Sequence, residues 1–136
     1  YVELYKGGIV PLADFVNMPY DRDILVRVIV KKTAAHYSYK SVRISKTDFP
    51  VLTCAAALTQ EGVQAAVGAR PAKAALVKDA EQLATLPMTA EKAQAFAEYA
   101  AGLLPTETNP RGSAAYRTHL IKVLTARCLT ELGGKA

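Results

Sequence analysis

Residues 49–58 read FPVLTCAAAL and carry no charge. Read with a period of two, both faces of this stretch are apolar: Phe49, Val51, Thr53, Ala55 and Ala57 on one, Leu52, Cys54, Ala56 and Leu58 on the other. A strand covered on both sides has this pattern. A buried helix would also suit an apolar run, but Pro50 near its start and Gly62 just beyond its end favour the strand. We therefore expect residues 49–58 to be the central strand.

The preceding stretch, SYKSVR at residues 38–43, predicts a neighbouring strand over 37–44 with a different alternation. Its alternating positions place Tyr37, Tyr39, Ser41 and Arg43 on one face and Ser38, Lys40, Val42 and Ile44 on the other. Aromatic rings and cations beside a central strand mark this strand as the place to look for chemistry.

Two further strands complete the predicted sheet. Residues 23–31 alternate, with Ile24, Val26, Val28 and Val30 on one apolar face. Gln60-Glu61-Gly62 predicts a short hairpin loop into a paired strand over 63–67. Pro71 cannot donate to a ladder, so Gly68-Ala69-Arg70-Pro71 should end that strand. The result is three or four strands in an antiparallel meander.

The rest of the chain has helical patterns. We expect a short helix over 79–84, a second over 90–104 capped by Thr89, and a third of some twenty residues between Ser113 and Gly133-Gly134. The predicted core stripe of the last helix is Tyr116, Leu120, Val123 and Leu124, widened by Ile121 and Cys128. The fold class is thus α+β: a three- to four-stranded antiparallel sheet packed against a C-terminal three-helix bundle.

Arginines 117 and 127 fall within or beside that stripe. Their stems could pack while their charged heads reach water, or one of them could be half-buried and paired with a carboxylate. Asp79, Glu91 and the other acids are scattered, so no carboxylate pair stands out.

Composition narrows the classes of function. The chain has 136 residues and a net charge of +5, and its cations are spread over several elements instead of forming the dense stripe of nucleic-acid binders. No apolar run approaches the roughly 20 residues that cross a bilayer. Cys54 and Cys128 are far apart in the chain on predicted core faces, which favours small buried residues in a reducing cytoplasm. The start at Tyr1 instead of Met suggests a fragment or a processed subunit.

No self-contained catalytic apparatus is evident in the sequence. It has no glycine-rich dinucleotide or phosphate loop, no nucleophile elbow and no Cys/His cluster for a metal. His36 and His119 lack the neighbours that a general base needs.

The order of motifs is more informative. Tyr39-Lys40 is followed by Asp48 and a strand containing Thr53-Cys54; later come Glu61-Gly62-Val63, the run 68–74, and Ser113-Ala114-Ala115-Tyr116-Arg117 opening the last helix. This order resembles the C-terminal domain of the FAD-binding (medium) subunit of molybdenum hydroxylases, the xanthine dehydrogenase and carbon monoxide dehydrogenase flavoprotein family. The resemblance covers nearly the whole chain. One departure is Gly68-Ala69, where many members carry a glycine pair.

The resemblance implies that 21–136 form the domain and that 1–20, loop-like here, are a linker or the tail of the preceding FAD-binding subdomain. In such a subunit Tyr39 and Lys40 lie nearest the flavin, where a cation favours the reduced ring, and Asp48 occupies the acidic position before the central strand. Asp48 could equally hold its turn. FAD would be held mainly by a part outside this chain, so the chain alone should bind none.

The implied partners are that N-terminal FAD-binding region, an iron–sulfur subunit and a molybdopterin subunit, with possible homo-oligomers but no nucleic acid or membrane. The function implied is that of an oxidoreductase subunit that carries electrons, not catalytic alone. The alternative is a stand-alone interaction or dimerisation module of the same fold.

Overall fold

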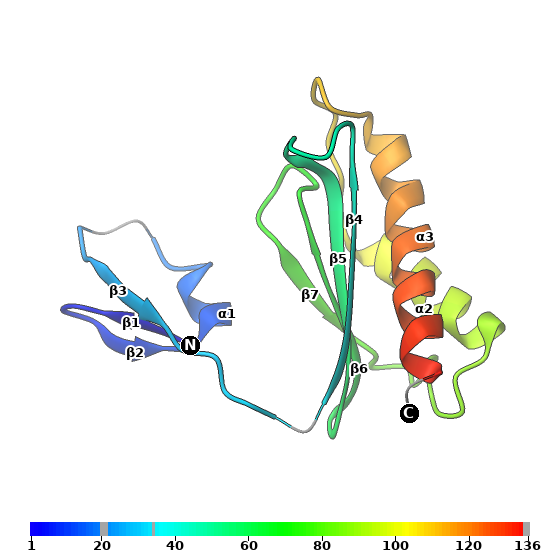
Figure 1. The fold of residues 1–136 in the computed structure, drawn as a ribbon, viewed down its shortest axis with the longest axis horizontal. Helices are drawn as coiled ribbons and strands as arrows, with labels where there is room; N and C mark the ends of the chain where they lie inside the picture. Colours follow the sequence, from blue (N-terminus) through cyan, green and yellow to red (C-terminus); the bar gives the residue numbers. More distant parts are fainter. Residues whose placement is uncertain (20–21, 34, 135–136) are drawn as a thin grey trace. The chain divides into compact units, whose positions relative to one another are not determined.

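Two compact units make up the chain (Figure 1). The computed structural model describes residues 1–19, 22–33 and 35–134. The first unit is Tyr1–Thr33 and the second is Ala34–Ala136. Each unit has its own sheet, so each is described separately.

The first unit is a three-stranded antiparallel sheet with strand order β2-β1-β3. Its elements are β1 (Val2–Leu4), β2 (Gly8–Val10), the short helix α1 (Leu12–Phe15) and β3 (Leu25–Val28). The Asp23 carboxylate accepts hydrogen bonds from the backbone N–H groups of Lys6 and Gly7, which fixes the β1–β2 turn. The prediction that residues 1–20 are loop-like is therefore wrong, because short strands with few apolar residues leave a weak periodic signal. Whether they are the tail of an FAD-binding subdomain stays a prediction.

The strand predicted over 23–31 forms in part, as β3, but its place in the fold was wrongly predicted. It pairs with β1 and not with the central sheet. Its apolar row Ile24, Val26, Val28 and Val30 is exposed, with exposed fractions of 65%, 52%, 60% and 84%. The alternation of apolar residues in the sequence showed that one face of this strand is apolar, but it did not show which strand would pair with it.

The second unit contains a four-stranded antiparallel meander with strand order β4-β5-β6-β7. The strands are β4 (His36–Arg43), β5 (Pro50–Thr59), β6 (Gly62–Gly68) and β7 (Ala75–Lys78). The predicted hairpin is confirmed, since Thr59 pairs with Gly62, whose φ of +106° suits glycine. After β6, Ala69 has a φ of +59°, a left-handed conformation for which glycine would be the less strained residue.

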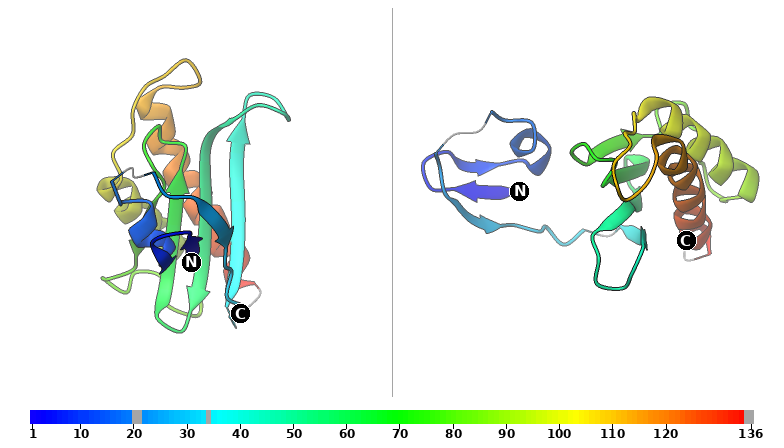
Figure 2. Two further views of the ribbon diagram at one scale, coloured as in Figure 1. Left: turned by 90° about the vertical axis from the view of Figure 1, so that its left-hand side faces the viewer. Right: turned by 90° about the horizontal axis from the view of Figure 1, so that it is seen from above.

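Two helices lie on one side of this sheet: α3 (Ala114–Gly133) packs on β4 and β5, and α2 (Ala90–Leu103) packs on α3. In the left view of Figure 2 the strands lie in front and α3 lies behind them. Both predicted caps are confirmed, because Thr89 accepts from the N–H of Lys92 and Ser113 from that of Tyr116. None of the helices in the described ranges is long and apolar enough to cross a membrane.

The α+β class and the packing of an antiparallel sheet against C-terminal helices are confirmed. The helix predicted over 79–84 is wrong: this segment is a turn in which the Asp79 carboxylate accepts from the N–H groups of Leu83 and Ala84. Strand β7, just before it, was missed. In the described part of the second unit the helical layer thus consists of α2 and α3.

The core lies between the sheet and these helices. Leu52, Cys54 and Ala56 of β5 face it and are at most 1% exposed. On the other face the predicted burial of β5 is confirmed at Ala57, which is 7% exposed, but not at Thr53 and Ala55. There Thr53 and Ala55 are half-exposed, and their small side chains keep the exposed apolar area low.

The stripe predicted for α3 is right at Leu120, Ile121, Leu124 and Cys128, only half-buried at Val123, and wrong at Tyr116. Tyr116 is 45% exposed, whereas Arg117 is only 1% exposed. Position 117 lies four residues before Ile121, so the arginine takes the core-facing position.

The buried Arg117 ties α3 to a β-bulge and to the preceding loop. Because Val42 pairs with Leu52 and Arg43 with Pro50, Val51 is an extra residue in β5. Arg117 Nε donates to the Val51 carbonyl at 3.0 Å. Its other nitrogens donate to acceptors in the loop, namely the carbonyls of Glu107 and Gly112 and Oδ1 of Asn109. Its partners are therefore carbonyl groups, and no carboxylate is among these four acceptors.

Candidate functional site

The face of the β4–β7 sheet opposite α3, here the open face, combines aromatic edge residues with mostly small side chains between them. Strand register places its residues in two rows, Tyr37–Ala57–Gln64–Lys78 and Tyr39–Ala55–Ala66–Leu76. Tyr37 and Tyr39 on β4 are 61% and 59% exposed, and Leu76 at the opposite edge is 51% exposed. Three of the four central positions are alanines, Ala55, Ala57 and Ala66, whereas the fourth is the longer, polar Gln64. Tyr39 and Leu76 therefore stand at the two ends of a flat apolar row.

The turn between β4 and β5 holds Asp48 by several local contacts. The Asp48 N–H donates to the Ser45 carbonyl, and its carboxylate accepts from the N–H of Phe49 at 2.7 Å. Arg43 Nη1 donates to the Asp48 carbonyl, and Arg111 Nε lies 3.6 Å from Asp48 Oδ1. The Arg111 guanidinium also lies over the Phe49 ring, 5.3 Å from its centroid. These contacts fit the turn-holding role that the sequence left open for Asp48.

Lys40 follows Tyr39 on β4, so its side chain lies on the opposite side of the strand, in contact with Glu131 of α3. Its ammonium is 2.7 Å from Glu131 Oε2, and the Ser38 hydroxyl donates to the same oxygen at 3.0 Å. Their side chains are 33% (Lys40) and 38% (Glu131) exposed, so the ion pair lies at the edge of the sheet–helix interface. The hydrogen bond to Glu131 raises the pKa of Lys40, which therefore stays charged.

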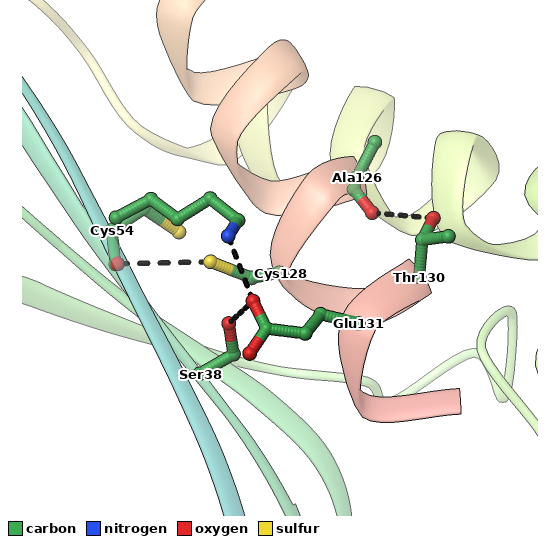
Figure 3. A network of polar contacts seen from close by, with 7 residues as sticks. Ser38, Cys54, Ala126, Cys128, Thr130 and Glu131 are labelled. Carbon is green, nitrogen blue, oxygen red and sulfur yellow. Dashed lines mark hydrogen bonds and ion pairs between the residues drawn. The ribbon is translucent and has the colours of Figure 1, made fainter. Parts of the chain in front are cut away.

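Two thiols lie directly behind this ion pair. Lys40 is the cross-strand neighbour of Cys54, and Cys128 Sγ lies 3.8 Å from the Cys54 carbonyl oxygen (Figure 3). Cys54 Sγ also lies 3.4 Å from the Thr125 hydroxyl. Both cysteines are 0% exposed. The fold thus brings together two cysteines that are far apart in the chain.

The two thiols have unequal acidities. Hydrogen bonding with the Cys54 thiol lowers the pKa of Cys128 to about 7, assisted by the Ser38 hydroxyl and the charge of Lys40. Hydrogen bonding with Cys128 and burial raise the pKa of Cys54. Cys128 is therefore the thiol that ionises first. In the described part of the chain, no three His, Cys, Asp or Glu side chains are grouped so as to hold a metal ion.

The three predicted site residues do not converge on one point. Tyr39 belongs to the open face, Lys40 to the helix-facing side and Asp48 to the β4–β5 turn. Sequence reasoning missed Glu131 as the partner of Lys40. The available signal was that Glu131 lies three residues after Cys128, hence on the same side of a helix.

Comparisons with known proteins agree with this fold. The structure is similar to quinoline 2-oxidoreductase from Pseudomonas putida 86, with a TM-score of 0.69 and 24% identity over 84% of this chain and 42% of that chain. It is also similar to a carbon monoxide dehydrogenase from Hydrogenophaga pseudoflava that lacks the Mo-pyranopterin moiety of the molybdenum cofactor, with a TM-score of 0.64 and 22% identity over 79% of this chain and 40% of that chain. The chain thus spans about two fifths of the solved chains it matches.

No curated protein sequence matches the chain. A family model, however, matches residues 37–132. This range begins at the second residue of β4, includes β5, β6, β7 and α2, and ends one residue before the end of α3. That match covers more than half of the sequence and agrees with the resemblance found in the motifs. The chain belongs to the CO dehydrogenase flavoprotein C-terminal domain family.

Proposed function

We propose that the chain is the C-terminal part of the FAD-binding subunit of a xanthine dehydrogenase-like molybdenum hydroxylase. The observation that carries this proposal is the family match over residues 37–132. A chain spanning about two fifths of its solved relatives also suits one part of a larger subunit. In this role the subunit passes electrons between an iron–sulfur subunit and FAD, while a molybdopterin subunit converts the substrate. A cytoplasmic location stays a prediction.

The open face fits a flat aromatic ring. Ala55 and Ala66 lie in register between Tyr39 and Leu76, so a planar group could rest on these alanines with Tyr39 against its edge or face. FAD, when bound, supplies the two-electron chemistry. The proposed task of the chain is to cover the ring and exclude water from it, while the region outside this chain holds the phosphates. Helping to assemble the complex is part of the same proposal.

Lys40 and Asp48 enter this proposal in different ways. The Lys40 ammonium lies against α3, so we propose that it acts on the flavin as a charge at a distance, reduced by its Glu131 partner. Asp48 is proposed to fix the end of β5 relative to the cofactor, through the turn that it holds.

The complete FAD-containing subunit provides the test. Tyr39→Ala should uncover the flavin, and we expect quenching of its fluorescence by iodide to increase. Tyr116→Ala is the matched control, because Tyr116 is a similarly exposed tyrosine on α3, outside the open face. Equal quenching in the parent and both variants would remove the open face from the flavin site.

A stand-alone dimerisation module is the second candidate, favoured by the exposed tyrosines and Leu76 on the open face. Such apolar patches also occur where two copies of a chain associate. It predicts that the 136-residue chain is a dimer in sedimentation experiments and that Tyr39→Ala makes it a monomer. A monomeric parent chain would eliminate this candidate.

A further inference from the structure

The sheet–helix interface contains a second chemical feature that the proposed function does not use. Cys54 lies on the central strand β5 and Cys128 on α3, and Cys128 Sγ reaches the backbone of the residue it faces. Around them are the Ser38 and Thr125 hydroxyls and the Lys40–Glu131 ion pair. This is an unusually polar neighbourhood for two buried thiols, which are otherwise inert when surrounded by apolar groups.

We propose that Cys54 and Cys128 form a reversible two-electron redox pair that hydrogen peroxide converts into a disulfide between β5 and α3. The proposal rests on the contact between Cys128 and Cys54 and on the polar side chains of Ser38, Lys40 and Glu131 beside them. Hydrogen peroxide is the oxidant because it is small enough to enter such a site. The disulfide would join residues 54 and 128 and thereby fix α3 on the sheet.

The Lys40–Glu131 ion pair is the proposed entrance. Both side chains are about one third exposed, at 33% and 38%, and partly exposed pairs of this kind open readily. Opening it removes the cover from the Cys128 side of the pair. Lys40 and the Ser38 hydroxyl then remain close enough to stabilise a thiolate, in agreement with the lowered pKa of Cys128.

The chemistry balances in two steps. In the first, the Cys128 thiolate attacks one peroxide oxygen; an S–O bond forms, the O–O bond breaks, and the hydroxide that leaves takes up the proton lost by the thiol. In the second, the Cys54 sulfur attacks the Cys128 sulfur; the S–S bond forms, the S–O bond breaks, and the departing hydroxide takes the Cys54 proton. Two thiols and one peroxide give one disulfide and two waters.

The test treats the complete purified protein, folded and in any assembly that it forms, with hydrogen peroxide. Remaining thiols are then alkylated and the peptides identified by mass spectrometry. We expect both thiols to disappear together, a peptide joining Cys54 to Cys128, and full recovery of the thiols with a dithiol reductant. Two free thiols in the folded protein, under conditions where the denatured protein is oxidised, would overturn the proposal.

Single variants distinguish the two roles. In the Cys54→Ser variant, the reaction should stop at a sulfenic acid on Cys128, which dimedone traps. In the Cys128→Ser variant, the remaining Cys54 should react roughly tenfold more slowly than Cys128 does, because less of Cys54 is thiolate at neutral pH. Circular dichroism checks that each variant is folded. If a variant is unfolded, the disulfide mapping in the parent protein is the test of the proposal. Faster oxidation of Cys54 than of Cys128 would reverse the assigned roles and contradict the proposed entrance. All these readouts are independent of flavin, so they do not depend on the proposed function.

Discussion

At the scale of single residues, the buried Arg117 should contribute more to the stability of the fold than Tyr116 beside it. Its guanidinium serves four acceptors in β5 and the 107–112 loop. Arg117→Ala should lower the free energy of unfolding by about 3 kcal/mol, because it removes a buried side chain and four hydrogen bonds, one of them to the buried Val51 carbonyl. Tyr116→Ala should cost less than about 1 kcal/mol, as for other surface changes. Urea unfolding measures both, and equal losses would contradict this assignment.

The sequence indicated the position of this arginine but not its role. The spacing from Arg117 to Ile121, Leu124 and Cys128 follows one helix face, so periodicity alone marks position 117 as buried. Tyr116 was predicted to be buried instead, because an aromatic side chain is more often found in a core than an arginine. The choice depends on the Val51 bulge and the loop carbonyls, which come from other parts of the chain and leave no local signal.

The charges of Lys40 and Glu131 should shift the proposed flavin's reduction potential in opposite directions. Lys40→Met removes a positive charge and should lower the potential, by up to tens of millivolts, since about 30 mV corresponds to 1.4 kcal/mol for a two-electron couple. Glu131→Gln should raise it, because Lys40 is then no longer neutralised. Potentials of the complete subunit are measured by spectroelectrochemistry. If neither variant changes the potential, Lys40 is not part of the flavin site.

The ionisation of Cys128 should depend on pH near neutrality. With its pKa lowered to about 7, its thiolate absorbance should rise around that pH and disappear in Cys128→Ser. The folded pKa lies below that of an unfolded cysteine, about 8.5, so the stabilisation from this group is present above the unfolded pKa and lost as pH falls through about 7. An ultraviolet titration with no step near neutrality in the parent protein would contradict it.

At the scale of elements, two helical glycines should respond oppositely to the same substitution. A Cβ on Gly133 would lie 2.5 Å from Met88 Cβ, where α3 meets the loop before α2, whereas a Cβ on Gly102 in α2 meets nothing within 4 Å. Gly133→Ala should destabilise the protein by about 1–3 kcal/mol through overpacking. Gly102→Ala should stabilise it by about 0.5–1 kcal/mol through helix propensity. Thermal unfolding of the pair tests the close packing, and a neutral Gly133→Ala would refute it.

Elements with strong local signals were predictable and those that depend on distant partners were not. The long apolar β5, the glycine hairpin and the capped helices follow from local rules. Strand β7 has only four residues, and Asp79 after it looked like a helix start although its carboxylate closes a turn. For the site, the sequence placed Tyr39 and Lys40 on opposite faces, but the Glu131 and Cys128 neighbours appear only when α3 packs on the sheet.

At the scale of the whole molecule, the two compact units should be separable. The second unit, Ala34–Ala136, has its own core between the sheet and α2 and α3. Deleting residues 1–33 should therefore leave one cooperative thermal transition and change the free energy of unfolding by less than about 1 kcal/mol, within the range of ordinary surface changes. Loss of that transition would show that the first unit supports the sheet.

The same deletion should reduce the binding of a hydrophobic dye. The exposed row on β3 and its flanks, Ile24, Val26, Val28 and Val30, belongs to the first unit, and exposed apolar rows of this kind bind such dyes. The matched control is the full chain with Val26→Ser and Val28→Ser, which should lose dye binding while keeping its thermal transition. If the deletion leaves dye fluorescence unchanged, the open face, with Tyr37, Tyr39 and Leu76, is the main apolar surface instead.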